Sequence, residues 1–193
     1  MMKEESTSLS ASVSEGILRR ILGPAADEVG LILRDKVQDY RKKNLSKMAS
    51  RALEIIANSD IEPREIPLRT LIPILERASV EDDEYLSEKW SRLFASASAS
   101  QFVTDSHPCF PQILSELSPL DVLLLDKLWE PGRPKSWSAF RKQQVENGID
   151  ERLLNMTFAS LDRAGLCSNS HEYNFTELGK AFMRAVTGSV GDS

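Results

Sequence analysis

The chain has 193 residues, of which 41% are hydrophobic, and its formal net charge at pH 7 is −5. This length suits one large domain or two small ones, and the apolar fraction is enough for a core that needs neither metal nor disulfides. The only cysteines, Cys109 and Cys167, exclude a disulfide framework and favour a reducing compartment. Residues 1–20 lack the apolar stretch of a secretory signal, and no apolar run approaches the ~20 residues that span a bilayer. We therefore expect a soluble, cytoplasmic protein.

Charge is distributed unevenly along the chain. Residues 13–51 contain nine basic and five acidic side chains, whereas residues 52–107 contain five basic and eleven acidic ones. Residues 108–185 are close to neutral, with nine basic and ten acidic side chains. The basic residues are densest at four positions, which we name the basic cluster: Arg41, Lys42, Lys43 and Lys47. On a helix such a cluster is usually a solvated face or the partner of an acidic segment, and the alternatives are binding to nucleic acid or to a membrane surface.

The first part of the chain predicts a disordered, Ser-rich lead-in over residues 1–12 and a helical domain over residues 13–106. A first helix is expected to end at Gly23 and Pro24, and a long second helix to end near Asn58. The predicted apolar stripe of the second helix consists of Val29, Leu33, Val37, Tyr40, Met48, Ala52 and Ile55.

Two further helices are predicted in the same domain. The first is expected to begin near Thr70, with Pro73 in its first turn, because an earlier start would require a kink at that proline. Ser79 is predicted to cap the second, with Glu81 to Glu84 in its first turn. The predicted apolar faces are Leu68, Leu71, Ile72 and Leu75 for the first helix, and Leu86, Trp90, Leu93, Phe94 and Ala97 for the second.

The last third of the chain has a different pattern, in which a connecting helix over residues 107–117 leads to a small domain over 118–187 and a tail over 188–193. Ser118, Pro119 and Asp121 predict a capped helix start. A second helix is expected around residues 137–145. A third begins at Asp150 and ends at Gly165, followed by a hairpin and a closing helix capped by Thr176. The predicted inner residues are Leu120, Leu123, Leu124, Leu128, Leu154, Phe158, Leu161, Leu178, Ala181, Phe182 and Ala185.

The predicted fold is therefore mainly α, with an N-terminal helical domain followed by a winged helix-turn-helix-like domain. Its order of three helices, a β-hairpin and a closing helix resembles that fold between about Ser118 and Val186. A winged helix usually suggests DNA binding, for which several Lys or Arg are needed on the third helix and the wing. Here the third helix has no net charge, and residues 167–175 contain neither Lys nor Arg. We therefore expect DNA binding to be weak, non-specific and carried by the basic cluster.

Four residues are candidates for a zinc site: His107, Cys109, Cys167 and His171. They are all the cysteines and histidines of the chain, and four such ligands are enough for tetrahedral zinc. The short His107-x-Cys109 spacing is unlike that of a zinc knuckle, so we expect no metal. The sequence also lacks a Gly-rich phosphate loop, a two-histidine metalloprotease motif and a nucleophile elbow. We accordingly predict no cofactor and no enzymatic activity.

Three segments together resemble the abortive-infection alpha family of bacterial proteins. They are GPAADEVGLILRDKVQDYRKKN, EPREIPLRTLIPILERASVEDDEYLSEKWSRLFASA and HPCFPQILSELSPLDVLLLDKL, which extend over roughly residues 22–128. The order and spacing of the segments carry the resemblance, including Gly23, Pro24, Asp35, Lys36, Tyr40 and Trp90. It implies a bacterial origin and a link to abortive infection, the response in which an infected cell stops supporting phage growth. It supplies no catalytic or ligand residues.

From these patterns we expect a non-enzymatic phage-defence protein that acts through protein–protein contacts, with a protein partner or a second copy of itself. One alternative is a winged-helix DNA-binding regulator. The other is a toxin that acts at the membrane through amphipathic N-terminal helices, without a transmembrane segment. Salt-dependent retention on DNA distinguishes the regulator, and leakage of liposomes distinguishes the toxin.

Overall fold

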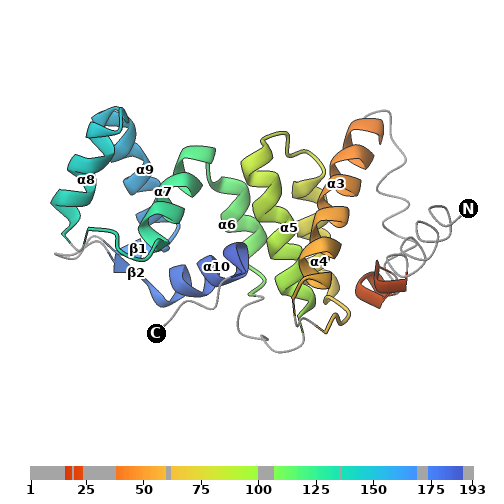
Figure 1. Ribbon diagram of the computed structural model, residues 1–193. Coiled ribbons are helices and arrows are strands. Elements are labelled where there is room, and N and C mark those ends of the chain that lie inside the picture. The colour runs from red at the N-terminus through yellow and green to blue at the C-terminus, as the bar shows by residue number, and fades with distance from the viewer. Residues whose placement is uncertain are drawn as a thin grey trace, which may run out of the picture. The chain divides into compact units, whose positions relative to one another are not determined.

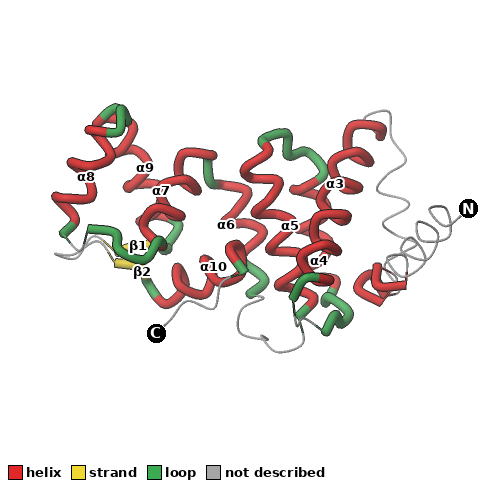
Figure 2. The backbone as a smooth tube through the Cα atoms, viewed as in Figure 1, coloured by secondary structure: helices red, strands yellow, loops and turns green. Residues whose placement is uncertain are grey.

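The computed structural model describes residues 16–18, 20–23, 38–59, 62–99, 107–134, 136–168 and 174–188. The described residues are mainly helical, with one two-stranded antiparallel sheet near the C-terminus, which confirms the predicted fold class (Figures 1 and 2). The chain divides into two compact units, residues 1–111 and 112–193. The predicted lead-in and all but the first residue of the predicted tail lie outside the described residues. The predicted domain boundaries stay a prediction.

The N-terminal unit is a set of packed helices. Its main elements are α3 (Gln38–Ala57), α4 (Leu68–Ala78) and α5 (Glu84–Ser98), and α3 contacts both α4 and α5. Residues 16–18 and 20–22 are also helical, and the backbone N–H of Ile66 donates to the carbonyl oxygen of Ile21 at 3.1 Å. This hydrogen bond joins residues 20–22 to the segment before α4. The side chains of Ile21 and Ile66 are both fully buried, so the two segments meet in the core.

The buried stripe of α3 differs in part from the predicted one. Met48 and Ala52 are buried as expected, but Tyr40 is 44% exposed and Ile56, not Ile55, continues the stripe. Leu45 is its fourth member. The buried face is rotated from the predicted one: at 3.6 residues per turn, Leu45 and Ile56 lie on one side of Met48 and Ala52, and Tyr40 and Ile55 lie on the other. The predicted stripe residues Val29, Leu33 and Val37 lie outside the described residues.

Helix α4 begins at Leu68, two positions earlier than predicted, so that Pro73 lies inside the helix. The carbonyl of Pro67 accepts hydrogen bonds from Thr70 N and Leu71 N, at 2.8 and 3.0 Å, and so closes the first turn without a side-chain cap. The buried face of α4 also differs in part from the predicted one, because it is set by the packing of α4 against α3 and α5. Leu68 is 43% exposed and Ile72 half-buried, so the predicted apolar face was wrong at both positions. The buried residues are Thr70, Leu71, Ile74, Leu75 and Ala78.

The prediction that Ser79 caps α5 was wrong. Ser79 ends α4, where its hydroxyl donates to the carbonyl oxygen of Glu76 at 2.6 Å. Asp83 caps α5 instead, because its carboxylate accepts from the backbone N–H groups of Tyr85 and Leu86 at 2.9 and 3.0 Å. A carboxylate at this position also interacts favourably with the positive end of the helix dipole. The buried face of α5 is confirmed: Leu86, Trp90, Leu93, Phe94 and Ala97.

The C-terminal unit contains the predicted order of three helices, a hairpin and a closing helix. A short helix, α6 (Phe110–Glu116), spans the boundary between the units. The elements that follow are α7 (Pro119–Trp129), α8 (Trp137–Glu146), α9 (Glu151–Arg163), β1 (Cys167–Ser168), β2 (Asn174–Phe175) and α10 (Glu177–Thr187). In the hairpin, Cys167 is opposite Phe175 and Ser168 opposite Asn174.

All three predicted helix caps of this unit are confirmed. Ser118 and Asp121 form a reciprocal capping box, in which each side chain accepts from the other's backbone N–H, at 3.2 and 2.8 Å. Asp150 caps α9 and Thr176 caps α10. Gly165 follows α9 with φ +70°, a conformation that glycine adopts without strain, which explains its position at the end of the helix.

The core of the C-terminal unit confirms part of the predicted list. Leu124, Leu128, Leu154, Phe158, Leu161, Phe182 and Ala185 are buried as expected. Leu123 is 38% exposed, and Val122 and Leu125 are buried in its place. Val122 and Leu125 lie on the side of α7 that packs against α9 and α10, and Leu123 is turned away from it. Leu120, Leu178 and Ala181 are only half-buried. Trp137 contacts Phe158 edge to face at 4.0 Å between ring centroids, which joins α8 to α9.

We predict that Gly179→Ala destabilises the protein by about 3 kcal/mol, as expected for forced overpacking of a buried site. A Cβ atom at Gly179 would lie 1.9 Å from the carbonyl oxygen of Leu166, so the backbone of the hairpin or of α10 must move. The same change in an exposed helix normally stabilises by roughly 1 kcal/mol, and the sign of the effect is therefore diagnostic. Urea unfolding measures it, with the neighbouring Lys180→Ala as the control. An unchanged or increased free energy of unfolding for Gly179→Ala contradicts the close approach.

Candidate functional site

The basic cluster does not form one continuous surface. Its four members lie on α3, where successive residues are rotated by about 100° around the helix axis. Arg41, Lys42 and Lys43 therefore face three directions, and only Lys43 and Lys47 share a face. Lys47 is paired with Glu84 of α5, with 3.1 Å between Nζ and Oε1. Arg41 is half-buried, and its Nε has no hydrogen-bond partner within the described part of the chain.

Ion pairs between α3 and α5 join the basic segment of the chain to the acidic one. Arg51 binds Glu88 through two hydrogen bonds, Nε to Oε2 at 2.8 Å and a terminal nitrogen to Oε1 at 3.1 Å. Glu88 also accepts from Arg92 Nε at 2.8 Å, and Arg51 donates to Glu54 at 3.0 Å. A bidentate pair of this kind is stronger than a single contact between exposed charges. The charge pattern seen in the sequence thus serves, at these positions, to hold two helices together.

The hydrogen bond from Arg51 lowers the pKa of the Glu88 carboxyl below its ordinary value, against the opposing effect of partial burial. The same interaction raises the pKa of Arg51. Both groups are therefore charged at neutral pH. A polar groove of about 300 Å³ runs beside them, and it is lined by Lys47, Ser50, Arg51, Glu54, Glu84, Ser87, Glu88 and Ser91. Its two basic and three acidic side chains are paired with one another, so the groove offers little excess charge to attract a ligand.

Three of the four zinc candidates lie within the described residues. His107 Nδ1 lies 2.9 Å from Cys109 Sγ and also accepts from the Cys109 backbone N–H, so these two residues form a local turn. Cys167 is buried in β1, and burial raises the pKa of its thiol to about 12, which keeps it protonated at neutral pH. His171 lies outside the described residues. Within the described ranges, no three His, Cys, Asp or Glu side chains are grouped to hold a metal ion.

The exposed face of α9 carries two arginines around an apolar centre. Arg152, Met156, Ala159 and Arg163 follow each other at intervals of four, three and four residues, which places them on one side of the helix. All four are exposed, Met156 by 68%, and Leu153 beside them by 48%. Glu151, at the start of the helix, is paired with Arg141 of α8 at 2.9 Å. We call Arg152, Leu153, Met156, Ala159 and Arg163 the α9 face.

The α9 face was not identified from the sequence, because the buried stripe of α9 accounted for the helix by itself. Leu154, Phe158 and Leu161 already form a complete buried stripe. Leu153 and Met156 are then in excess of what the core needs, and that excess was the available signal. Large apolar side chains that remain exposed beside a complete core stripe are typical of contact surfaces.

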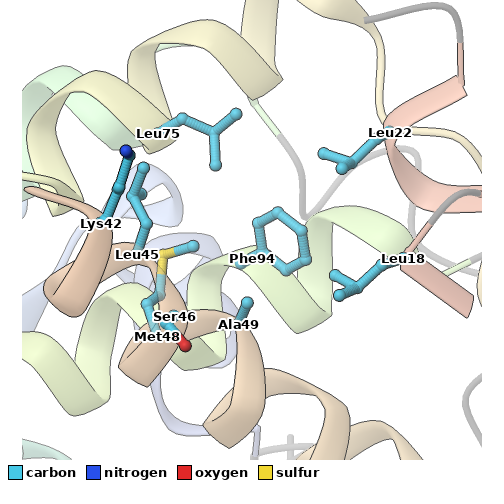
Figure 3. Close-up of a pocket in the computed structure, with 9 residues that line it drawn as sticks. All are labelled: Leu18, Leu22, Lys42, Leu45, Ser46, Met48, Ala49, Leu75 and Phe94. Carbon is cyan, nitrogen blue, oxygen red and sulfur yellow. The ribbon is translucent and has the colours of Figure 1, made fainter. Parts of the chain in front are cut away.

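An apolar pocket of about 250 Å³ lies within the N-terminal unit (Figure 3). Leu18 and Leu22 contribute from the first helical residues, and Leu75 and Phe94 from α4 and α5. The other lining residues come from α3: Lys42, Leu45, Ser46, Met48 and Ala49. This pocket could not be predicted from the sequence, because its walls come from four segments that are distant along the chain.

We predict that Glu88→Gln lowers the free energy of unfolding at pH 7. A group whose pKa is lowered in the folded protein contributes stability above its unfolded pKa, and this contribution is lost as the pH falls through the lower folded value. The difference between Glu88→Gln and the unaltered protein should therefore shrink as the pH falls below 4.5, the ordinary value for glutamate. Urea unfolding at several pH values measures it. Glu54→Gln, at a more exposed partner of Arg51, is the control and should have a smaller effect. A constant difference from pH 7 to acid contradicts the assignment.

The described residues contain no helix that is long and apolar enough to cross a membrane. In a comparison with known families, the family model described as abortive infection alpha matches residues 36–165. The match begins later than the resemblance expected from residue 22 and extends beyond residue 128, so that it takes in α8 and α9 as well. No match was found among curated proteins or among solved structures. On the extent of this match, the chain belongs to the abortive infection alpha family.

Proposed function

We propose that the protein takes part in abortive infection of phage-infected bacteria, and that it acts by binding another protein and not by catalysis. Membership of the abortive infection alpha family supports the first part. The α9 face supports the second, because it combines two of the side chains that are enriched at protein interfaces, Met and Arg. The α9 face is the observation on which the proposal of protein binding rests.

The chemistry of the α9 face indicates the kind of partner. Met156 is flexible and polarisable, so it adapts to an uneven apolar surface. Arg152 and Arg163 lie about three helical turns apart on either side of it and favour carboxylates at both edges of the contact. A partner segment with an apolar centre and acidic ends fits this arrangement. In protein–protein interfaces, most of the binding energy comes from such a buried centre, and the contacts around it exclude water.

DNA binding is the second candidate, and one observation favours it. Arg152 and Arg163 lie on the exposed side of α9, which in the order of elements corresponds to the helix that reads bases in winged helix-turn-helix proteins. Two features weigh against it. Met156 and Leu153 occupy the area between the arginines, where a DNA-reading helix needs polar side chains, and the hairpin segment 167–175 contains no Lys or Arg for phosphate contacts.

We predict that Met156→Glu abolishes protection in a phage plaquing assay on cells that express the protein. The substitution places a charge in the apolar centre of the α9 face, at a position that contributes little to the core. The control is Val80→Glu, since Val80 is also exposed, by 49%, and belongs to the other compact unit. Both variants should show unchanged thermal unfolding. Full protection by Met156→Glu, or equal loss in the control, contradicts a contact through α9. A pull-down from infected cells with each variant then shows whether a bound protein is lost together with protection.

A separate prediction distinguishes the DNA-binding candidate. Any retention on DNA should be weak, should fall with salt, and should not change when Arg152 and Arg163 are both replaced by Ala, because two arginines release few counterions. Replacing the basic cluster should lower such retention only in part, because Lys47 is paired with Glu84 and the other members face different sides of α3. Fluorescence anisotropy with labelled duplex DNA at two salt concentrations measures both. Sequence-specific binding at physiological salt that is lost in Arg152→Ala/Arg163→Ala would favour the regulator instead.

A further inference from the structure

Four residues along the centre of the α9 face have the spacing of a helix–helix contact. Arg152, Met156, Ala159 and Arg163 are separated by four, three and four residues, which is the repeat of the positions that face a partner helix in a coiled coil. The buried residues of α9 lie on the opposite side of the helix, so this stripe points away from the core. At a rise of about 1.5 Å per residue, the stripe is about 16 Å long.

Both arginines of the stripe are available to a partner. Arg152 and Arg163 are exposed, and within the described part of the chain neither guanidinium group forms an ion pair. Arg141 of α8, in contrast, is paired with Glu151. A guanidinium group binds a carboxylate through two parallel hydrogen bonds, which a lysine cannot do. The two ends of the stripe therefore favour acidic residues in a partner protein.

The α9 face offers a partner side chains but no backbone groups. The backbone N–H and C=O groups along a helix are hydrogen-bonded to one another, so those beneath Met156 and Ala159 are already used. A strand or a loop laid across these residues would bury backbone groups without a hydrogen-bond partner, at a large cost in free energy. A helix satisfies its own backbone groups, and it is therefore the structure that suits this face.

A second copy of α9 does not fit the stripe. In an antiparallel pair Arg152 would lie opposite Arg163, and in a parallel pair each arginine would lie opposite its own counterpart. Like charges placed opposite each other disfavour a contact. The flanks of the stripe also differ, because at about 100° per residue Asp162 lies on one side and Leu153 on the other. An acidic partner is repelled by Asp162 and packs toward Leu153.

From these features we propose that the α9 face binds an amphipathic helix of another protein, with a carboxylate at each end of its contact stripe and large apolar side chains between them. Ala159 ends at its Cβ atom, so a large side chain of the partner fits there beside Met156. This proposal rests on the proposed function, because it names the kind of partner that the same surface binds.

Fluorescence anisotropy of labelled synthetic peptides with the full chain tests the proposal. The first probe is an alanine-rich peptide with Glu, Leu, Leu and Glu at intervals of four, three and four residues, and we expect saturable binding of one peptide per chain. A peptide with Lys in place of both Glu should bind about tenfold more weakly, since two attractive charge pairs become repulsive. A peptide with Pro between the two Leu should bind roughly a hundredfold more weakly, because proline breaks the helix. Absence of saturable binding by the first peptide, or equal binding by either of the others, overturns the proposal.

Protein variants place the peptide on the α9 face. Arg152→Glu/Arg163→Glu should reverse the preference, so that the Lys peptide binds about tenfold more tightly than the Glu peptide. Arg69→Glu/Arg77→Glu makes the same change of charge at exposed positions of α4, in the other compact unit, and should keep the preference for the Glu peptide. Circular dichroism verifies each fold, and loss of Glu-peptide binding in Met156→Glu is the second readout if the charge-reversed variant does not fold. A preference that is not reversed in the first variant, or that is reversed in the control, overturns the assignment.

The plaquing assay separates this proposal from the proposed function. Loss of protection in Met156→Glu, with no binding of the Glu peptide to the unaltered protein, overturns the helical partner and leaves a protein contact through α9 in place. Binding of the Glu peptide, with full protection in Met156→Glu, contradicts the proposed function and leaves the helical contact in place.

Discussion

The packing of α3 against α5 is the contact from which the other features of the N-terminal unit follow. Both helices bury large side chains, Met48 on α3 and Trp90 and Phe94 on α5, each about 1% exposed. At the edge of this apolar contact, Arg51 and Glu88 form a bidentate ion pair. The apolar burial supplies most of the stability, while the ion pair fixes which residues of the two helices lie opposite each other. Once this register is set, Lys47 is held near Glu84, and Phe94 forms a wall of the apolar pocket.

This arrangement changes the meaning of the charge pattern. A dense run of Lys and Arg on one helix suggests a surface for a polyanion, but part of that charge is used inside the unit. Lys47 pairs with Glu84, Lys42 lines an apolar pocket, and Arg41 is half-buried. What is left of the basic cluster is too dispersed around α3 to act as one surface. The candidate contact surface lies instead on α9, where two arginines flank an exposed methionine.

The C-terminal unit depends on a different constraint, the close approach of α10 to the hairpin. The carbonyl of Leu166 accepts from Thr176 N at 3.0 Å and lies against Gly179, where a side chain has no room. Thr176 at the same time caps α10. These contacts fix the end of the hairpin to the start of α10, which leaves the outer side of α9 uncovered. The family match, which ends at residue 165, includes that face but not the hairpin or α10.

The sequence by itself determined the helical class, the order of elements and the features that depend on neighbours along the chain. The capping box of Ser118 and Asp121, the cap Thr176 and the stop at Gly165 are of this kind, because each requires only residues within one turn. The buried face of α5 was also predictable, since one period of 3.6 residues fits it throughout. The family was recognisable because the order and spacing of its segments are properties of the sequence.

Only the tertiary structure decided which apolar and charged residues are used inside. Leu68, Leu123 and Tyr40 fit a helical stripe as well as their buried neighbours do, and their exposure depends on where the adjacent helices lie. Ser79 and Asp83 are both good caps, and the choice followed from where α4 ends. The α9 face was missed, although Leu153 and Met156 exceed the buried stripe of α9, and the apolar pocket could not be predicted, because each depends on distant segments. The first is defined by what the core leaves uncovered, and the second by walls from four segments that meet only after folding.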